Sequence, residues 1–332
     1  MELAEKTGLK SNGTNNADLG RVVVLYGGRS GERAVSLKGG EAVLRGLQAQ
    51  GVDAHGLDVG LGWIAELEAL AADRIFIVLH GAGGEDGTVQ GALECMGLPY
   101  TGSGVLASAL AMDKLRCKQL WQGVGLSTAD FELLHADCDW AGVLERLGGE
   151  AMVKPASEGS SLGMAKANSA EELQAAWVVA AAYDKVVIAE RWLSGSEYTV
   201  AVLNGRALPV IKLETDRVFY DYEAKYLAND TRYLCPCGLT KEEEISLQNL
   251  ALEAFSSLGC RGWGRVDLMI ADTGEACLLE VNTVPGMTDH SLLPMAGKAE
   301  GLSFNSLLLE ILKSSDLGDL ALSAGGVSEE RY

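Results

Sequence analysis

The stretch GWGRVDLMIADTGEACLLEVN, residues 262–282, predicts a β-hairpin, because two apolar runs flank Asp272-Thr273-Gly274. A symmetric turn of two or four loop residues places Asp267 directly opposite Glu280, whereas a three-residue loop would break that pairing. Side chains alternate between the two faces of a strand. The polar face is therefore expected to hold Arg265, Asp267, Glu280 and Asn282, and the core face Val266, Leu268, Ile270, Leu279 and Val281.

Two acidic side chains face each other in this register, and like charges directly opposite each other destabilise a sheet. A cation is therefore expected between Asp267 and Glu280. Arg265 would neutralise part of the charge. Magnesium suits the rest, because it binds hard oxygen ligands from a few carboxylates together with substrate phosphates. The alternative is a solvated polar face with an incidental ion pair.

Lysines and a glycine-serine loop provide the other half of a possible nucleotide site. Lys154 ends an apolar strand just before Glu-Gly-Ser-Ser-Leu-Gly at residues 158–163, a loop whose backbone N–H groups and hydroxyls could cover phosphates. Lys114 and Lys225 lie in similarly compact contexts. The chain has no G-x-x-x-x-G-K-[ST] segment, so it is not a P-loop protein.

The same loop also matches a G-x-S-x-G nucleophile elbow, with Ser161 as the nucleophile and Asp267 and His290 available as triad partners. This pattern makes an α/β-hydrolase the rival class. An elbow needs a strand that turns directly into a helix. Here Pro155 follows the strand, and residues 164–167 are predicted to form the return strand of a hairpin, which disfavours the elbow.

The chain as a whole divides into three blocks and two terminal extensions. Strand, helix, strand with glycines at the strand ends, at residues 21–26, 36–50 and 74–79, is the doubly wound α/β pattern, in which ligands bind beyond the carboxyl ends of strands. Later strands alternate in a more α+β manner. The predicted units are a flexible leader at 1–20, a Rossmann-like domain at 21–103, a central subdomain at 104–189, a C-terminal subdomain at 190–313 and a mobile tail at 314–332.

Composition narrows the function classes. The 332 residues include 27 basic and 46 acidic side chains, a formal net charge of -19, which argues against binding to nucleic acid or to an anionic membrane surface. The polar N-terminus has no signal-peptide core. Seven scattered cysteines favour reduced thiols in the cytoplasm over a disulfide scaffold, and Cys235 and Cys237 have no second pair with which to form a metal site.

Several long motifs, in order, resemble the D-alanine–D-alanine ligases of the ATP-grasp superfamily, and the likeness spans residues 22–313. The motifs are GGRSGERAVS at 27–36, LHG at 79–81 with GEDGT at 84–88, YTGSG at 100–104, MDK at 112–114, VKP at 153–155 with EGSS at 158–161, YDYEAKY at 220–226, GRVD at 264–267, EVNTVPGM at 280–287 and HSL at 290–292.

The resemblance implies an ATP-grasp fold, with ATP between the second and third blocks and bound magnesium, two ions with Glu280 bridging; manganese is an acceptable substitute. The implied metal ligands are Asp267, Glu280 and Asn282. The implied ATP-binding residues are Lys114, Lys154, Glu158, Gly159, Ser160, Ser161, Glu190, Arg191, Trp192, Leu193, Glu197 and Lys225.

The resemblance also implies ligation of two D-alanines through an acyl phosphate, for peptidoglycan precursor synthesis by a cytoplasmic homodimer. Tyr226 favours D-alanine over D-lactate, and a ligase that uses D-lactate or another acid is the alternative. The implied catalytic residues are Glu32, Ser160, Arg265, Lys225, Tyr226 and Gly286, and the implied substrate contacts are Glu32, His80, Arg265, Asn282, Gly286, Ser291 and Leu292. Ala34 departs from the family pattern, since a second glutamate is common there.

Overall fold

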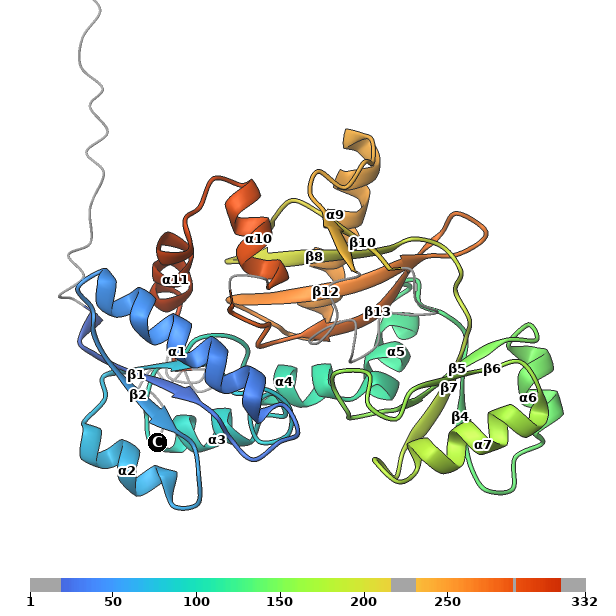
Figure 1. Cartoon of the computed structure of the whole chain (residues 1–332), viewed down its shortest axis with the longest axis horizontal. Coiled ribbons are helices and arrows are strands. Elements are labelled where there is room, and N and C mark those ends of the chain that lie inside the picture. The colour runs from blue at the N-terminus through green and yellow to red at the C-terminus, as the bar shows by residue number, and fades with distance from the viewer. Residues whose placement is uncertain (1–18, 216–230, 289–290, 318–332) are drawn as a thin grey trace, which may run out of the picture.

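The computed structural model describes residues 19–215, 231–288 and 291–317, and it arranges them around three separate sheets (Figure 1). The sheets follow one another along the chain as the three predicted blocks do. Lys225, Tyr226 and His290 lie outside the described residues. No helix within the described ranges is long and apolar enough to cross a bilayer.

The first sheet is parallel, with the strand order β2-β1-β3, as the doubly wound pattern predicts. Its central strand is completely buried over Val22, Val23, Val24 and Leu25, because side chains of helices α1, α2 and α3 pack with it in one core. The elements of this part are β1 (Arg21–Tyr26), α1 (Arg33–Ala49), β2 (Asp53–Asp58), α2 (Trp63–Leu70), β3 (Arg74–Ile77) and α3 (Thr88–Cys95).

The second sheet is antiparallel, with the order β4-β7-β5-β6. The chain leaves β5 through residues 158–163 and returns as β6, so a strand, not a helix, follows the G-x-S-x-G segment. This geometry contradicts the nucleophile elbow. The elements are β4 (Phe131–Leu134), α6 (Trp140–Arg146), β5 (Ala151–Pro155), β6 (Ala165–Ala167), α7 (Ala170–Ala180) and β7 (Val187–Arg191).

The third sheet has the order β11-β10-β8-β12-β13, and the short β9 pairs with β8. Helices α4, α5 and α9 pack on one face, where Trp121, Phe255 and Val266 share a core. The elements are α4 (Val105–Met112), α5 (Lys114–Gly123), β8 (Glu197–Leu203), β9 (Arg206–Ala207), β10 (Ile211–Glu214), β11 (Arg232–Leu234), α9 (Lys241–Ser257), β12 (Trp263–Ile270), β13 (Ala276–Asn282), α10 (Leu292–Ala299) and α11 (Phe304–Lys313).

The hairpin of β12 and β13 confirms the predicted pairing of Asp267 with Glu280, but by a route that differs from the prediction. Ala271 N–H donates to Glu275 O at 2.7 Å, which leaves a three-residue loop, 272–274, with Gly274 at a φ of +86°. This odd loop alone would set Asp267 opposite Leu279. A β-bulge next to Asp267 shifts the register by one residue and brings Glu280 back into place.

Because of the bulge, the predicted core face is wrong at Leu279. Leu278, not Leu279, is fully buried in the core beneath the sheet, whereas Leu279 lines a pocket on the opposite face together with Glu280. Two consecutive side chains on one face are what a bulge produces, because it interrupts strict alternation.

The first sheet contacts both the third sheet and the last described residues. Trp263 of β12 packs on Phe76 of β3, with 5.9 Å between the ring centroids, so the first and third sheets share a core. Asp316 pairs with Tyr100 through two backbone hydrogen bonds of 2.8 and 3.2 Å. The residues where the predicted tail begins therefore contact the first block.

Candidate active site

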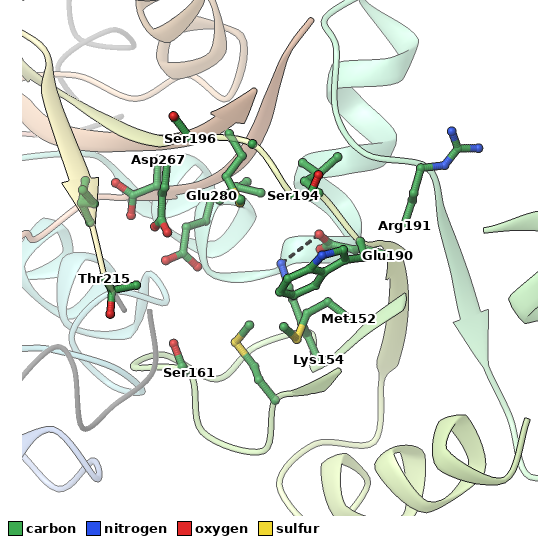
Figure 2. Close-up of a pocket in the computed structure, with 18 of the residues that line it drawn as sticks. Met152, Lys154, Ser161, Glu190, Arg191, Ser194, Ser196, Thr215, Asp267 and Glu280 are labelled. Carbon is green, nitrogen blue, oxygen red and sulfur yellow. Dashed lines mark hydrogen bonds and ion pairs between the residues drawn. The ribbon is translucent and has the colours of Figure 1, made fainter. Parts of the chain in front are cut away.

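Two pockets adjoin at the third sheet. One, with a volume of about 370 Å³, lies between the second and third sheets, and its lining includes Lys154, Glu190 and Asp267 (Figure 2). The other, of about 460 Å³, lies between the first and third sheets, and its lining includes Glu32, His80 and Arg265. Both volumes are in the range of small-molecule sites. Here they are called the first pocket and the second pocket.

Lys114 and Glu280 line both pockets and so form the wall that these share. Lys114 Nζ lies 3.3 Å from Glu280 Oε2 and donates to Glu158 O at 2.8 Å. Burial alone would lower the pKa of Lys114, but Glu280 outweighs that effect and raises the pKa above its ordinary value. A permanent cation beside a carboxylate therefore stands at the boundary, next to the loop predicted to cover phosphates.

Asp267 is buried and its carboxylate is fully engaged. Arg265 donates to it through Nε and Nη2 at 2.8 and 2.7 Å, Thr199 Oγ1 at 2.6 Å and Asn282 Nδ2 at 3.2 Å. The predicted neutralisation by Arg265 is thus present in the ligand-free arrangement. Thr199 was not predicted, since it comes from β8, a strand distant in sequence.

The donor set at this wall fits magnesium. Asp267 and Glu280 side chains lie together on the face of the sheet that the first pocket exposes (Figure 2). Two carboxylates suffice for magnesium when substrate phosphates supply further oxygens. Among the described residues no cluster of three or more His, Cys, Asp or Glu side chains offers another metal site. Asn282 would join only after its amide turns to present oxygen, because its nitrogen now faces Asp267.

The far end of the first pocket contains a buried ion cluster. Lys154 Nζ donates to Glu190 Oε2 at 2.8 Å (Figure 2), and Lys118 Nζ lies 3.4 Å from the same oxygen. Burial would raise the pKa of Glu190, but Lys118 and Lys154 outweigh it and lower the pKa. Lys118 was not predicted. From sequence alone, a lysine on a helix is expected to be a solvated surface charge. Lys118 is buried because its partners come from other elements.

The remaining residues predicted to bind nucleotide all line the first pocket, except Gly159, Ser160 and Lys225. Arg191 points its guanidinium away from the pocket and pairs with Asp130 at 2.8 Å (Figure 2). Trp192 lies beneath Lys166, whose Nζ is 4.3 Å from the ring centroid. The set that lines the pocket is Lys114, Lys154, Glu158, Ser161, Glu190, Arg191, Trp192, Leu193 and Glu197; Gly159 and Ser160 line the second pocket, and Lys225 is outside the described residues.

The loop of residues 158–163 reaches the second pocket through Ser160. Ser160 Oγ hydrogen-bonds to Glu32 Oε1, so a side chain at the start of α1 meets the loop after β5. Ser160 and Ser161 both adopt left-handed backbone conformations, with φ of +53° and +59°. The structure thus brings together Glu32 and Ser160, which the resemblance links, while Tyr226 lies outside the described residues.

A buried imidazole and a half-buried carboxyl group line the second pocket beside Glu32. Burial lowers the pKa of His80 despite the nearby Glu32 carboxylate, and His80 Nε2 has no hydrogen-bond partner among the described residues. Glu85 accepts from Gly81 N–H at 2.6 Å, and burial followed by repulsion from Glu32 raises its pKa to about 8. Glu85 was not predicted, although it lies within the quoted GEDGT motif.

The opposite side of the second pocket consists of Gly286, Ser291 and Leu292. Ser291 precedes α10 and accepts a hydrogen bond from Thr288 N–H at 2.9 Å. A Cβ at Gly286 would lie 2.9 Å from Ser291 Oγ, so a larger residue there would displace the Ser291 hydroxyl. The predicted contacts of the second substrate therefore surround the same cavity as Glu32, His80, Arg265 and Asn282.

Comparison with known proteins gives one consistent result. Family models described as D-ala D-ala ligase N-terminus and C-terminus match residues 60–103 and 120–313. The chain is 60% identical over 298 residues to a D-alanine–D-alanine ligase of Saccharophagus degradans, covering 90% of this chain and 95% of the relative. It is 58% identical to one of Nitrosococcus oceani over 296 residues, covering 89% and 94%.

Solved structures agree in fold. A crystal structure of the D-alanine–D-alanine ligase of Bacillus anthracis superposes with a TM-score of 0.81 at 32% identity, covering 92% of this chain and 99% of that chain. The same enzyme complexed with ATP gives a TM-score of 0.79 at 30% identity, covering 93% and 100%.

Proposed function

The chain belongs to the D-alanine–D-alanine ligase family, and we propose that it performs the ligation across the Lys114–Glu280 wall, with ATP on one side and D-alanine on the other. It is an ATP-grasp enzyme that uses ATP to join two D-alanines, a step of peptidoglycan synthesis. The division of labour among its own residues is the proposal.

One observation carries the proposal: the two pockets share Lys114 and Glu280. A phosphoryl group can pass between two molecules only if its donor and acceptor oxygens lie nearly in line at contact distance. A nucleotide whose terminal phosphate reaches this wall is within contact distance of a carboxylate bound in the second pocket. Because Lys114 is pinned between Glu280 and the backbone of Glu158, its charge is already in position.

We assign the first pocket to ATP. The base lies against Glu190, Arg191, Trp192 and Leu193, and Glu197 takes the ribose. Lys114 and Lys154 bind phosphate oxygens, and the loop with Glu158, Gly159, Ser160 and Ser161 covers them. Lys225, outside the described residues, completes the set by family resemblance.

We assign the second pocket to the two D-alanines. Glu32 accepts the ammonium group of the first, and His80 lies near its carboxylate. A carboxylate oxygen attacks the γ-phosphorus of ATP, the bond to the β-phosphate oxygen breaks, and ADP and an acyl phosphate form. Ser160 links Glu32 to the loop above it.

The second D-alanine then binds with its carboxylate at Ser291 and Leu292. Its neutral amine attacks the acyl carbonyl, the bond from that carbon to the bridging oxygen breaks, and phosphate leaves as the nitrogen loses a proton. Arg265 and the N–H of Gly286 stabilise the oxyanion, and Tyr226 is expected to favour an amine over a hydroxyl partner. Arg265 can serve this purpose because it already lies along the wall, paired with Asp267.

Asp267, Glu280 and Asn282 are the proposed magnesium ligands, and Mn²⁺ is expected to substitute. A bound ion there would supply positive charge that neutralises the transferred phosphoryl group. Among the described residues, Arg265 already pairs with Asp267 and Lys114 with Glu280.

The test is a substrate panel with ATP and magnesium. Phosphate release should require D-alanine and yield a product with the mass of the dipeptide, whereas L-alanine alone should release none. D-lactate offered together with D-alanine should give no ester at neutral pH. Phosphate release independent of D-alanine would contradict the proposed function.

Three further properties belong to the same proposal. A homodimer and a cytoplasmic location follow the family pattern. So do the domain boundaries given above, except that α4 and α5 pack on the third sheet and Asp316 contacts the first block. All seven cysteines are free thiols, which supports a reducing compartment. Light scattering of the purified protein tests the dimer.

A further inference from the structure

Lys118 is a buried cation behind the first pocket. It lies one turn after Lys114 on α5, its side chain is 0% exposed, and it is not among the residues that line the pocket. Its Nζ donates to Thr128 Oγ1 at 2.5 Å, and Thr128 Oγ1 donates in turn to Leu278 O at 2.8 Å. Lys118 is therefore tied to β13, two residues from Glu280.

The two carboxylate oxygens of Glu190 differ: two lysines contact Oε2, and neither contacts Oε1. Lys154 and Lys118 both contact Oε2, at 2.8 and 3.4 Å. Oε1 is buried without a hydrogen-bond partner among the described residues. A buried acceptor without a donor is costly, and Glu190 lines the first pocket, so Oε1 is suited to a base that carries an amino group.

Lys154 has two competing partners when a nucleotide binds. Its ammonium group is paired with Glu190 (Figure 2), yet its proposed role is to bind phosphate. If Lys154 moved to the phosphates and nothing else remained, Glu190 would become an uncompensated buried charge, which is strongly unfavourable. Lys118 remains, because it is enclosed and bonded to Thr128.

We propose that Lys118 is a positioning residue for nucleotide binding: it is the fixed counter-ion of Glu190 and thereby releases Lys154 to the phosphates of ATP. The inference rests on the proposed assignment of the first pocket to ATP. Lys118 and Lys154 lower the pKa of Glu190 against the effect of burial. Burial lowers the pKa of Lys118, and Glu190 opposes that shift, so each group supports the charge of the other.

The primary test is the affinity for magnesium-ATP, measured by calorimetry without D-alanine. In Lys118→Met, Glu190 can pair only with Lys154, so the Kd for ATP should rise about tenfold or more, the equivalent of losing one hydrogen bond to a charged group. Lys118→Arg keeps the charge in a bulkier side chain, so the Kd for ATP should rise less than in Lys118→Met. Lys241→Met, at an exposed lysine on α9, is the control.

A double variant separates positioning from a general packing defect. Glu190→Gln no longer holds Lys154, so adding Lys118→Met to it should change the Kd for ATP by less than about twofold. The KM for D-alanine should be unchanged in Lys118→Met. An equal loss of ATP affinity in both backgrounds, or no loss in Lys118→Met, would overturn the inference.

Because the affinity is measured without D-alanine, the inference and the ligase function fail separately. A chain that binds ATP as expected but makes no dipeptide would refute only the function. Thermal unfolding without nucleotide identifies any variant that fails to fold, and Lys118→Arg then carries the test through its comparison with Glu190→Gln.

Discussion

The position of Glu280 depends on the turn, on the bulge and on its ion pair with Lys114. The three-residue turn would turn it toward the core, the bulge returns it to the pocket face, and Lys114 then pairs with it at 3.3 Å. A carboxylate that faces Asp267 requires a cation in every state of the site. Arg265 pairs with Asp267 and Lys114 with Glu280, and magnesium-ATP is expected to add to this compensation during turnover.

Glu280→Gln should reduce kcat/KM by about 100-fold or more, since even a supporting partner of a metal ligand typically contributes 10- to 100-fold. Folding should change little, because the side chain is 25% exposed. The measurement is dipeptide formation at saturating magnesium. Glu275→Gln, exposed in the same hairpin, is the matched control, and near-normal activity of Glu280→Gln would refute the metal assignment.

Glu85 gives the free protein a pH-dependent stability. Its pKa is about 8 when folded, against 4.5 for an ordinary glutamate, so between these pH values the folded protein keeps a proton that the unfolded chain has lost. The free energy of unfolding should therefore fall as the pH rises through this window. In Glu85→Gln that fall should be shallower, as urea denaturation at several pH values would measure.

The control for Glu85 is Glu66→Gln, at an exposed position on α2. It should reproduce the pH dependence of the unmodified protein. If Glu85→Gln did the same, the proton would reside elsewhere in the second pocket.

Site residues could be predicted from sequence where a pattern of neighbouring residues indicates their position. Strand alternation and a turn signal predicted the hairpin and its polar face. The pairing of Asp267 with Glu280 is correct, but it depends on a bulge that offsets a three-residue loop, and the local pattern indicated neither. Lys118 could not be found in this way, because its partners Thr128 and Glu190 come from other elements and only the folded chain brings them together. Glu85 likewise acquires its pKa from burial and from Glu32, more than fifty residues earlier.

At the scale of elements, α1 shows how packing positions a catalytic group. The helix begins directly after Glu32, and Gly40 lies against Tyr26 of β1. A Cβ at position 40 would overlap the Cβ and Cγ of Tyr26, so the helix can approach the sheet closely only with glycine there. The position of Glu32 depends on this approach.

Gly40→Ala should therefore lower the free energy of unfolding by about 1–3 kcal/mol, the usual effect of overpacking. Chemical denaturation would measure the loss, and the KM for D-alanine should rise as Glu32 shifts. Gly123→Ala is the control, because nothing lies within 4 Å of its Cβ and alanine favours a helix. Equal stability of the two variants would contradict the packing argument.

The elements themselves followed from sequence more readily than their details. Apolar runs and glycines predicted the parallel first sheet and the hairpin of β5 and β6. The bulge at Leu279 was not predicted, because a bulge depends on which residues pack against both faces of the sheet, and its neighbours here come from other elements. The same bulge explains why Leu279, expected in the core, lines the first pocket.

At the scale of the molecule, function arises where the three sheets meet. The third sheet contributes Glu280 and Asp267, the second the loop and Lys154, and the first Glu32 and His80. Contacts such as Trp263 with Phe76 fix the first sheet against the third. No single block contains a complete site, so sequence patterns within each block could indicate the ligand types but not their alignment.

The most direct test of this arrangement follows the oxygen atoms of the substrate. If ATP in the first pocket activates a carboxylate in the second, D-alanine labelled with ¹⁸O in its carboxyl group should pass one ¹⁸O to each phosphate released, as mass spectrometry of the phosphate would detect. Phosphate that carries only solvent or ATP oxygen, at a normal rate of dipeptide formation, would contradict the account.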